Sequence, residues 1–277
     1  MQLFVNQLTN VDFSYLDAAR GLVGETWLAS AILDGVLDDQ GMVCDFGIVK
    51  KTLRNWLDDE VDHRLLVPIQ SPSLELIEDD DRVELSWLSD HGRLTMSAPR
   101  EAVSLIDAVA ITDESVAEWC RQQLKAFFPV NVDQLTLTFE PEVIPGAFYH
   151  YSHGLKKHDG NCQRIAHGHR SRLHIWLEGE RNPELETLWA KRWQDIYIGS
   201  QEDLVSESET DMQFGYESAQ GQFALSVPTS TCYMIDTDST VEWIAEHIAS
   251  ELAREYPQQA IRVQAFEGIN KGAFSIR

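Results

Sequence analysis

Residues 151–155 read Tyr-Ser-His-Gly-Leu, and shortly after them residues 161–170 read Asn-Cys-Gln-Arg-Ile-Ala-His-Gly-His-Arg. This short part of the chain contains three imidazoles and a thiol: His153, His167, His169 and Cys162. Two histidines at i and i+2 on a strand face the same side of a sheet, and a third on the neighbouring strand completes a three-nitrogen set. Three protein ligands with an open fourth position are typical of a catalytic zinc site. Histidine-rich loops also occur simply in solvent, so spacing alone leaves both interpretations open.

Charge is distributed unevenly around these histidines. The chain has a formal net charge of −23, yet residues 153–174 contain five cations and one carboxylate, Asp159. The cations are Lys156, Lys157, Arg164, Arg170 and Arg172. A solvated basic loop is the common explanation of such a cluster, but beside a metal site it favours an anionic ligand. His158 lies in a Lys-Lys-His-Asp-Gly turn and is expected to face solvent.

These residues resemble the family of 6-pyruvoyltetrahydropterin and 6-carboxytetrahydropterin synthases. The family pattern is an aromatic strand ending in His-x-Leu and then a Cys shortly before His-Gly-His, which is similar to residues 148–155 and 162–169 here. Three more segments resemble family motifs: Gly41-Met-Val-Cys-Asp45-Phe46, Val61-Asp62-His63, and the strand from Val263 to Glu267. The resemblance therefore covers both halves of the chain.

The two halves also resemble each other. Phe139-Glu140, followed by Gly146-Ala-Phe, parallels Phe266-Glu267, followed by Gly272-Ala-Phe, and Gly24-Glu25 parallels Gly168-His169. Two related domains, 1–145 and 146–277, fit a chain of 277 residues.

Each copy lacks part of the family's site. The metal positions His153, His167 and His169 correspond to Asp17, Val23 and Glu25 of the first copy, so the first copy is not expected to bind zinc. The second copy, in turn, has no Asp-His pair like Asp62-His63. Because the family builds its sites at contacts between subunits, the resemblance implies a composite site, formed by the two halves within one chain or between chains.

The resemblance implies a fold of the α+β class with two tandem T-fold domains. Each has the order strand-strand-helix-helix-strand-strand, with an antiparallel sheet, two helices and one extra hairpin. The expected strands are 3–11, 26–33, 135–139, 147–153, 168–178, 261–267 and 272–276; the helices are 46–60, 114–128, 183–195 and 240–255; the hairpins are 83–96 and 212–227. The strand 147–153 is expected to close the first sheet as well as open the second.

Two helix starts have capping signals. Asp45 is expected to cap the helix 46–60, with Phe46, Val49, Leu53 and Trp56 facing the core at helical spacing. Ser239 with Glu242 has the spacing of a capping box at the helix 240–255. Both signals favour structural roles for these residues over catalytic ones.

The resemblance also implies roles for individual residues. Zn²⁺ would bind His153, His167 and His169, and Cys162 would act in acid–base catalysis together with Asp62 and His63. Glu267, or its counterpart Glu140, would anchor the pterin. Lys156, Arg164 and Arg170 are expected to contact a triphosphate. The alternative for Cys162 is an inert buried thiol, which is common for a free cysteine.

The implied substrate is 7,8-dihydroneopterin triphosphate. The leading hypothesis is a lyase that forms 6-carboxytetrahydropterin on the route to queuosine. The alternatives are a 6-pyruvoyltetrahydropterin synthase, which eliminates triphosphate, and a zinc- and pterin-binding homologue without turnover.

Composition sets limits on the remaining function classes. The four cysteines are scattered, which argues against a disulfide framework. The sequence contains neither a long apolar run nor a signal-peptide pattern, so a cytoplasmic protein without a membrane partner is expected. The acidity argues against nucleic acid as a partner. The resemblance implies a homo-oligomer, as a dimer or trimer of two-domain chains.

Overall fold

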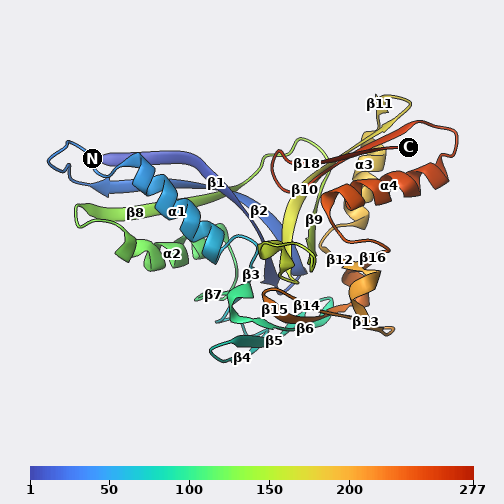
Figure 1. Ribbon diagram of the computed structural model, residues 1–277, viewed down its shortest axis with the longest axis horizontal. Helices are drawn as coiled ribbons and strands as arrows, with labels where there is room; N and C mark the ends of the chain where they lie inside the picture. The colour runs from blue at the N-terminus through green and yellow to red at the C-terminus, as the bar shows by residue number, and fades with distance from the viewer.

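The computed structural model describes residues 1–277 and shows two wings joined above a third sheet (Figure 1). The first half forms the left wing, with the N-terminus at its tip, and the second half forms the right wing, where the C-terminus lies. The elements of the first half are β1 (Gln2–Asp17), β2 (Gly21–Gly35), α1 (Phe46–Glu60), β3 (Leu65–Pro68), β4 (Leu74–Glu78), β5 (Arg82–Ser89), β6 (Gly92–Pro99), β7 (Val103–Ile106), α2 (Asp113–Leu124) and β8 (Val132–Pro141).

The second half repeats this order with two additional strands, β11 after the first pair and β18 at the end. Its elements are β9 (Phe148–His153), β10 (His167–Leu177), β11 (Glu180–Arg181), α3 (Pro183–Arg192), β12 (Ile196–Ser200), β13 (Leu204–Glu207), β14 (Asp211–Ser218), β15 (Gly221–Pro228), β16 (Cys232–Ile235), α4 (Val241–Glu255), β17 (Ile261–Phe266) and β18 (Gly272–Ile276). All four helices occur where periodicity predicts them. None of them is both long and apolar enough to cross a membrane.

The first helix shows how the local signals act. The Asp45 side chain accepts hydrogen bonds from the backbone N–H groups of Gly47 and Ile48, as expected of an N-cap. Val49 and Leu53 are buried on the face toward the sheet. The expectation for Phe46 is wrong, because its side chain is 50% exposed.

Each wing is one sheet covered by two helices. The strand order is β7-β3-β1-β2-β8 in the first wing and β16-β12-β9-β10-β17-β18 in the second. The strand β9 pairs with β10 and β12 and not with β8, so the expectation that it also closes the first sheet is wrong. The strand β8 is therefore an open edge, and β18 is an edge of the second sheet.

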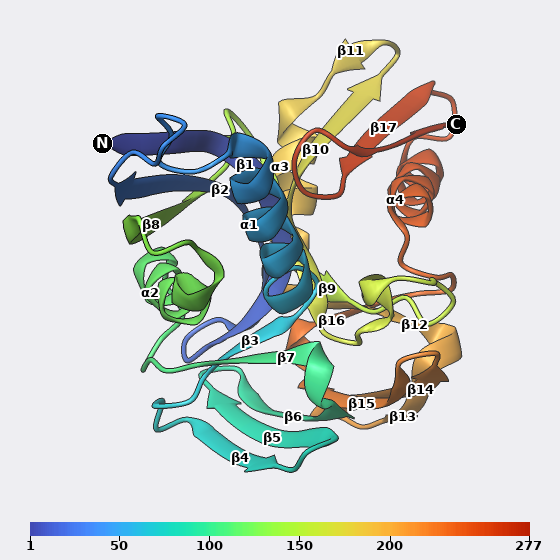
Figure 2. The same cartoon turned by 60° about the vertical axis from the view of Figure 1, so that its left-hand side comes forward.

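The two predicted hairpins form a single structure that joins the wings. With the edge strands β4 and β13 they make a six-stranded sheet, β13-β14-β15-β6-β5-β4, which we call the clasp sheet (Figure 2). Its central pair, β15 with β6, links the two halves through the antiparallel register of Ala224 with Ser97. Its inner face covers a core that mixes both halves, including Trp87 and Met96 with Phe214 and Phe223. Hydrophobic burial thus fixes one repeat against the other.

Candidate active site

The three histidines predicted as ligands converge in the structure. His153 ends β9 and lies directly opposite His167 of β10, and His169 follows two residues later on the same face. All three side chains are buried, and one ring nitrogen from each lies within 4.8 Å of the others. The spacing of the histidines on two paired strands produces this cluster.

His153 and His167 each have one ring nitrogen hydrogen-bonded to the protein and one without a partner, whereas His169 has only a close carboxylate beside its Nδ1. Nδ1 of His153 bonds the Ser239 hydroxyl at 2.9 Å, and Nδ1 of His167 bonds the Arg164 carbonyl oxygen at 2.9 Å. Nδ1 of His169 lies 3.3 Å from Oδ1 of Asp12. The three Nε2 atoms are buried without hydrogen-bond partners. Buried polar atoms normally have partners, so three orphaned nitrogens with oriented rings fit a metal ion.

The protonation of the cluster also suits a metal. Burial, followed by the neighbouring imidazoles, holds the pKa of His153 and of His167 well below the usual value for histidine. Both rings are therefore neutral at physiological pH. A metal ligand must be the neutral imidazole, so no proton has to be displaced from these two rings.

Ser239 has a different role from the one its spacing indicates. The N-cap of α4 is Thr240, whose side chain accepts from the Trp243 N–H. Ser239 instead directs both its hydroxyl and its carbonyl oxygen to Nδ1 of His153. The capping-box prediction, which made Ser239 the cap, is therefore one residue too early.

Asp12 is a site residue that the sequence did not reveal. It is 1% exposed, comes from the first half, and faces His169 of the second. Thr26 donates to its Oδ1 at 2.5 Å, and Nζ of Lys271 lies 3.2 Å from its Oδ2. The available signal was a carboxylate flanked directly by two apolar residues, Val11 and Phe13.

Asp12 also contacts Asp62 and His63 through its backbone. Its N–H donates to Oδ1 of Asp62 at 2.7 Å, and its carbonyl oxygen accepts from the His63 N–H at 2.6 Å. Its carboxylate at the same time faces the ring of His169. One residue of the first half therefore links the histidine cluster to Asp62-His63.

The pair Asp62-His63 lies beside Cys162, although the two come from different halves. Oδ2 of Asp62 bonds Nδ1 of His63, and His63, Cys162 and His167 offer donor atoms within 4.8 Å of one another. Burial alone would lower the pKa of His63, but Asp62 and the Cys162 thiol raise it to about 10. His63 has φ of 54°, a left-handed conformation that is uncommon for histidine and that occurs often at functional sites.

Of the two predicted pterin anchors, the structure brings Glu267 to the cluster. Its Oε1 lies 3.9 Å from Nε2 of His169, and its Oε2 lies 3.9 Å from Nζ of Lys271. Glu140 is exposed on the edge strand β8, where its backbone pairs with Leu28.

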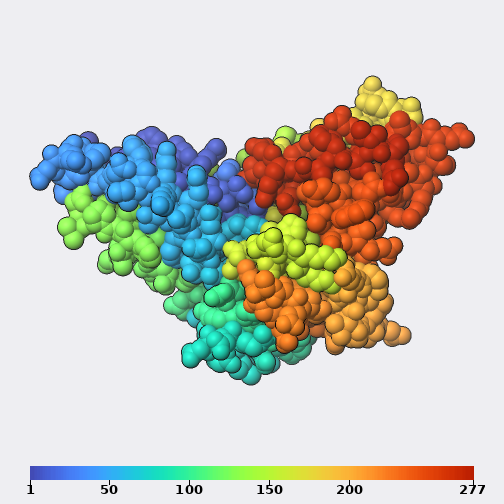
Figure 3. All heavy atoms as spheres, in the orientation of Figure 1, coloured from blue at the N-terminus to red at the C-terminus, as the bar shows by residue number.

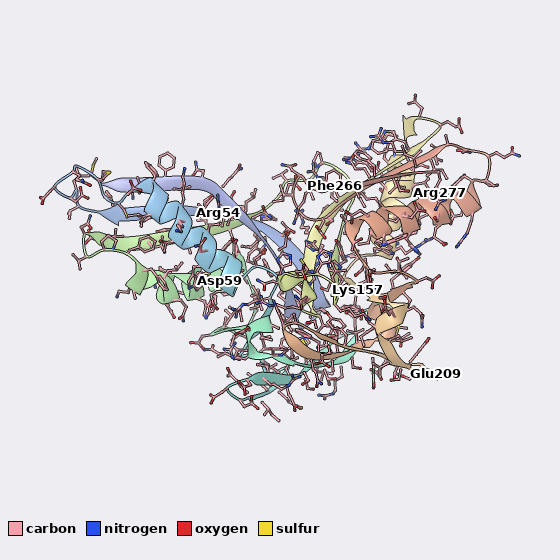
Figure 4. The ribbon with its side chains drawn as sticks, in the orientation of Figure 1. Arg54, Asp59, Lys157, Glu209, Phe266 and Arg277 are labelled. Carbon is pink, nitrogen blue, oxygen red and sulfur yellow. The ribbon has the colours of Figure 1, made fainter.

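The predicted triphosphate contacts are largely engaged elsewhere. Nζ of Lys156 lies 2.7 Å from Asp203, and Lys157, labelled in Figure 4 near the junction of the wings, pairs with Glu202 at 2.6 Å. Arg164 is 5% exposed. Arg170 donates to the Glu142 carbonyl oxygen at 2.6 Å and alternates with His169 along β10, so it faces away from the cluster. Acidic neighbours thus neutralise the two lysines of this cationic cluster.

The first copy has a different set of side chains at the place that corresponds to the histidine cluster. Glu25 takes the position of His169, and Nδ1 of His150 lies 3.8 Å from its carboxylate. Nε of Arg20 donates to Asp195 at 2.9 Å. Asp195 precedes β12 as His63 precedes β3, and its φ of 57° matches the left-handed conformation of His63. We call these four residues the converted site.

Fold and site together define a tandem two-domain α+β protein with a buried histidine cluster suited to a metal. A sequence model of the family named 6-pyruvoyl tetrahydropterin synthase matches residues 14–144 and again residues 145–275. The chain therefore belongs to this family, as two tandem copies of its T-fold.

Individual relatives match about half of the chain. A Pyrococcus horikoshii protein with the provisional name 6-carboxy-5,6,7,8-tetrahydropterin synthase is 26% identical over 126 residues, which cover 45% of this chain and 71% of that protein. The structure of 6-pyruvoyltetrahydropterin synthase from Plasmodium vivax is 19% identical, with a TM-score of 0.39, and covers 51% of this chain and 98% of that one. Its Plasmodium falciparum counterpart is 16% identical at the same TM-score of 0.39 and the same coverage.

The contact of Asp12 with His169 predicts the effect of Asp12→Asn on metal binding. Loss of the carboxylate that orients a ligating histidine should weaken metal affinity by roughly 10- to 100-fold. Competition with a chelator measures this. Asp17→Asn is the control, because Asp17 lies on the same strand and only caps the turn at Ala19 and Arg20. Equal affinity of the two variants would contradict the role of Asp12.

Glu25 in the converted site predicts a pH dependence of stability. Burial raises its pKa to about 7 from the usual 4.5. The folded state therefore binds a proton that the unfolded state releases near pH 4.5, and this stabilisation is lost as the pH rises through 7. Relative to Glu25→Gln, the wild type should lose about 2–3 kcal/mol of unfolding free energy between pH 4.5 and 7.5.

Urea unfolding across this pH range tests the prediction, with Asp133→Asn as the exposed-carboxylate control. A constant difference in unfolding free energy between the wild type and Glu25→Gln would show that Glu25 ionises normally.

Proposed function

We propose that the protein is a zinc-dependent lyase that converts 7,8-dihydroneopterin triphosphate to 6-carboxy-5,6,7,8-tetrahydropterin in queuosine biosynthesis. The observation that carries the proposal is the meeting of Cys162 with Asp62-His63 beside three converging Nε2 atoms. A structural metal site would need neither the thiol nor the acid–base pair. The name of the Pyrococcus relative favours the 6-carboxy product.

His153, His167 and His169 would hold the zinc ion. When bound, zinc supplies a Lewis acid that polarises side-chain oxygens of a substrate and acidifies the neighbouring positions. Ser239, the Arg164 carbonyl and Asp12 keep the three rings in place.

Proton transfer would fall to Cys162 and His63. The reaction needs a group that removes a proton from the substrate side chain and a second that exchanges one with its oxygens. Cys162 is half-buried and near His63, which suits it to the first task. Asp62 fixes the His63 ring and favours its protonated form, so His63 suits the second.

Glu267 would hold the pterin ring. A carboxylate can accept hydrogen bonds from the amino group and ring N–H of a pterin, and Glu267 is the carboxylate at the rim of the histidine cluster. Lys156 and Arg164 remain the proposed triphosphate contacts, and binding would exchange their present partners, Asp203 and Gln220, for phosphate oxygens. Arg170 is not retained, because it faces the other side of β10.

Cys162→Ala tests the enzyme assignment. Turnover of 7,8-dihydroneopterin triphosphate should fall at least 1,000-fold, because the proton acceptor is lost, while zinc content stays at the wild-type level. Mass spectrometry of the products is the measurement, and Cys232→Ala in β16 is the matched cysteine control.

The product distinguishes the candidate reactions. A 6-carboxytetrahydropterin mass with acetaldehyde supports the proposal, and a 6-pyruvoyl product would replace it with triphosphate elimination. Tight zinc and pterin binding without turnover in the wild type would instead identify a binding protein.

The open edges lead us to propose a homo-oligomer. Unpaired strand edges tend to pair with another chain, and β8 and β18 end the two wing sheets. Copies of the chain could join β8 of one to β18 of the next, giving a dimer or trimer. Light scattering should report two or three chain masses, and a monodisperse monomer would contradict the proposal.

A further inference from the structure

The turn of the β14–β15 hairpin reaches the segment that carries Cys162. This segment, residues 154–166, connects β9 to β10, and we call it the thiol loop. Figure 3 shows its atoms in yellow-green, seated between the wings and above the orange atoms of the clasp sheet. The hairpin is an insertion for which the proposed chemistry provides no role.

Four hydrogen bonds join the hairpin to residues on both sides of Cys162, one from Tyr216 of β14 and three from Gln220 of the turn. The Tyr216 hydroxyl donates to the Gln163 carbonyl oxygen at 2.7 Å. The Gln220 side chain donates through Nε2 to Asn161 Oδ1 at 2.9 Å and accepts at Oε1 from Nε of Arg164 at 3.3 Å. The Gln220 N–H approaches Oε1 of Gln163 at 3.4 Å. Every neighbour of the thiol from 161 to 164 is thus held by the hairpin.

The backbone of the thiol loop fits the tyrosine closely. A Cβ atom on Gly154 would collide with the Tyr216 hydroxyl and with the backbone of Ile165. Tyr216 also packs its ring 5.5 Å from that of Phe223, in the core beneath the clasp sheet. The hydroxyl therefore comes from a fixed ring.

The polar contacts of the hairpin turn extend to Asp62-His63. Arg164, held by Gln220, directs its Nη1 to the Asp62 carbonyl oxygen at 3.5 Å. Gln220, Arg164 and Asp62 thus form a polar connection from the second-half hairpin to the first-half motif. This connection runs alongside Cys162 and His63.

The first copy provides an internal comparison. There Asp90 N–H donates to the Ala18 carbonyl oxygen at 2.9 Å and Trp87 Nε1 to that of Asp17 at 3.1 Å, so this hairpin also docks on its own β1–β2 connection. That connection is only the short turn at residues 18–20. The second copy has lengthened it, placed a thiol in it, and added side-chain contacts from the hairpin turn.

We propose that Gln220 and Tyr216 are positioning residues that hold Cys162 against His63. A long loop has many conformations, whereas a reacting group must be held to within roughly half an ångström. The bond from Leu155 N–H to the Cys162 carbonyl oxygen, at 2.9 Å, closes the thiol loop on itself but does not orient it toward the first half. The hairpin supplies that orientation. The effect on turnover rests on the proposed function, but the effect on the loop does not.

Gln220→Ala and Tyr216→Phe test the proposal in the full-length, zinc-loaded protein. Hydrogen exchange should become at least 5-fold faster at the amides of Leu155, His158 and Arg164, which are bonded within the thiol loop. The turnover number for dihydroneopterin triphosphate should fall about 10-fold in both variants. KM should stay within 2-fold in Tyr216→Phe, which leaves Glu267 and the Gln220–Arg164 contact in place. Zinc content should not change.

His91→Ala, in the exposed turn of the matching first-copy hairpin, is the control and should change neither quantity. Tyr216→Phe keeps the packed ring, so a change in this variant reports the loss of the hydroxyl and not a loss of the fold. Unchanged hydrogen exchange in both variants would overturn the proposal, even if turnover were lost. A wild type without turnover would remove the proposed reaction, while the exchange experiment would still decide whether the hairpin holds the loop.

Discussion

The composite site depends on one backbone crossing, where β2 and β10 meet at Gly24 and Gly168. A Cβ atom on Gly24 would fall on the Tyr151 carbonyl group, and one on Gly168 would meet that same group and the Gly24 Cα. Only glycine allows the two hairpins to approach this closely. A buried hydrogen bond of 2.7 Å between the hydroxyls of Ser14 and Ser152 fixes the crossing. This approach brings Asp12 to His169 across the repeat boundary.

The same crossing creates two equivalent contacts, and the two have diverged. On one side an imidazole, His169, faces a carboxylate, Asp12; on the other a carboxylate, Glu25, faces an imidazole, His150. Burial lowers the pKa of His150 to about 4 and raises that of Glu25 to about 7, so both side chains of the second contact are uncharged between about pH 4 and pH 7. Arg20 with Asp195 then occupies the place of an acid–base pair. The converted site is a structural contact between the halves, which explains how one copy could lose its histidines without losing the fold.

Local patterns predicted the parts of the structure that depend on local periodicity. The histidines at i and i+2, the Asp45 cap and all four helices follow from spacing along a single element. The roles of Asp12 and Ser239 do not, because each acts on a ring that belongs to a distant strand. The parallel pairs β3 with β7 and β12 with β16, and the fusion of two hairpins into the clasp sheet, are also long-range. Alternation identifies a strand's faces but not its neighbour.

Because the two halves belong to one chain, folding and not subunit association brings their residues together. A site divided between separate subunits is lost on dilution, because the acid–base pair and the thiol then separate. Here Asp62-His63 and Cys162 share a polypeptide, a glycine crossing and a core beneath the clasp sheet, so their effective concentration is set by the fold. Association through β8 and β18 would cover strand edges, whereas the histidine cluster, Cys162 and Asp62-His63 already meet within one chain. The meeting of these groups therefore depends on the contact between the two halves.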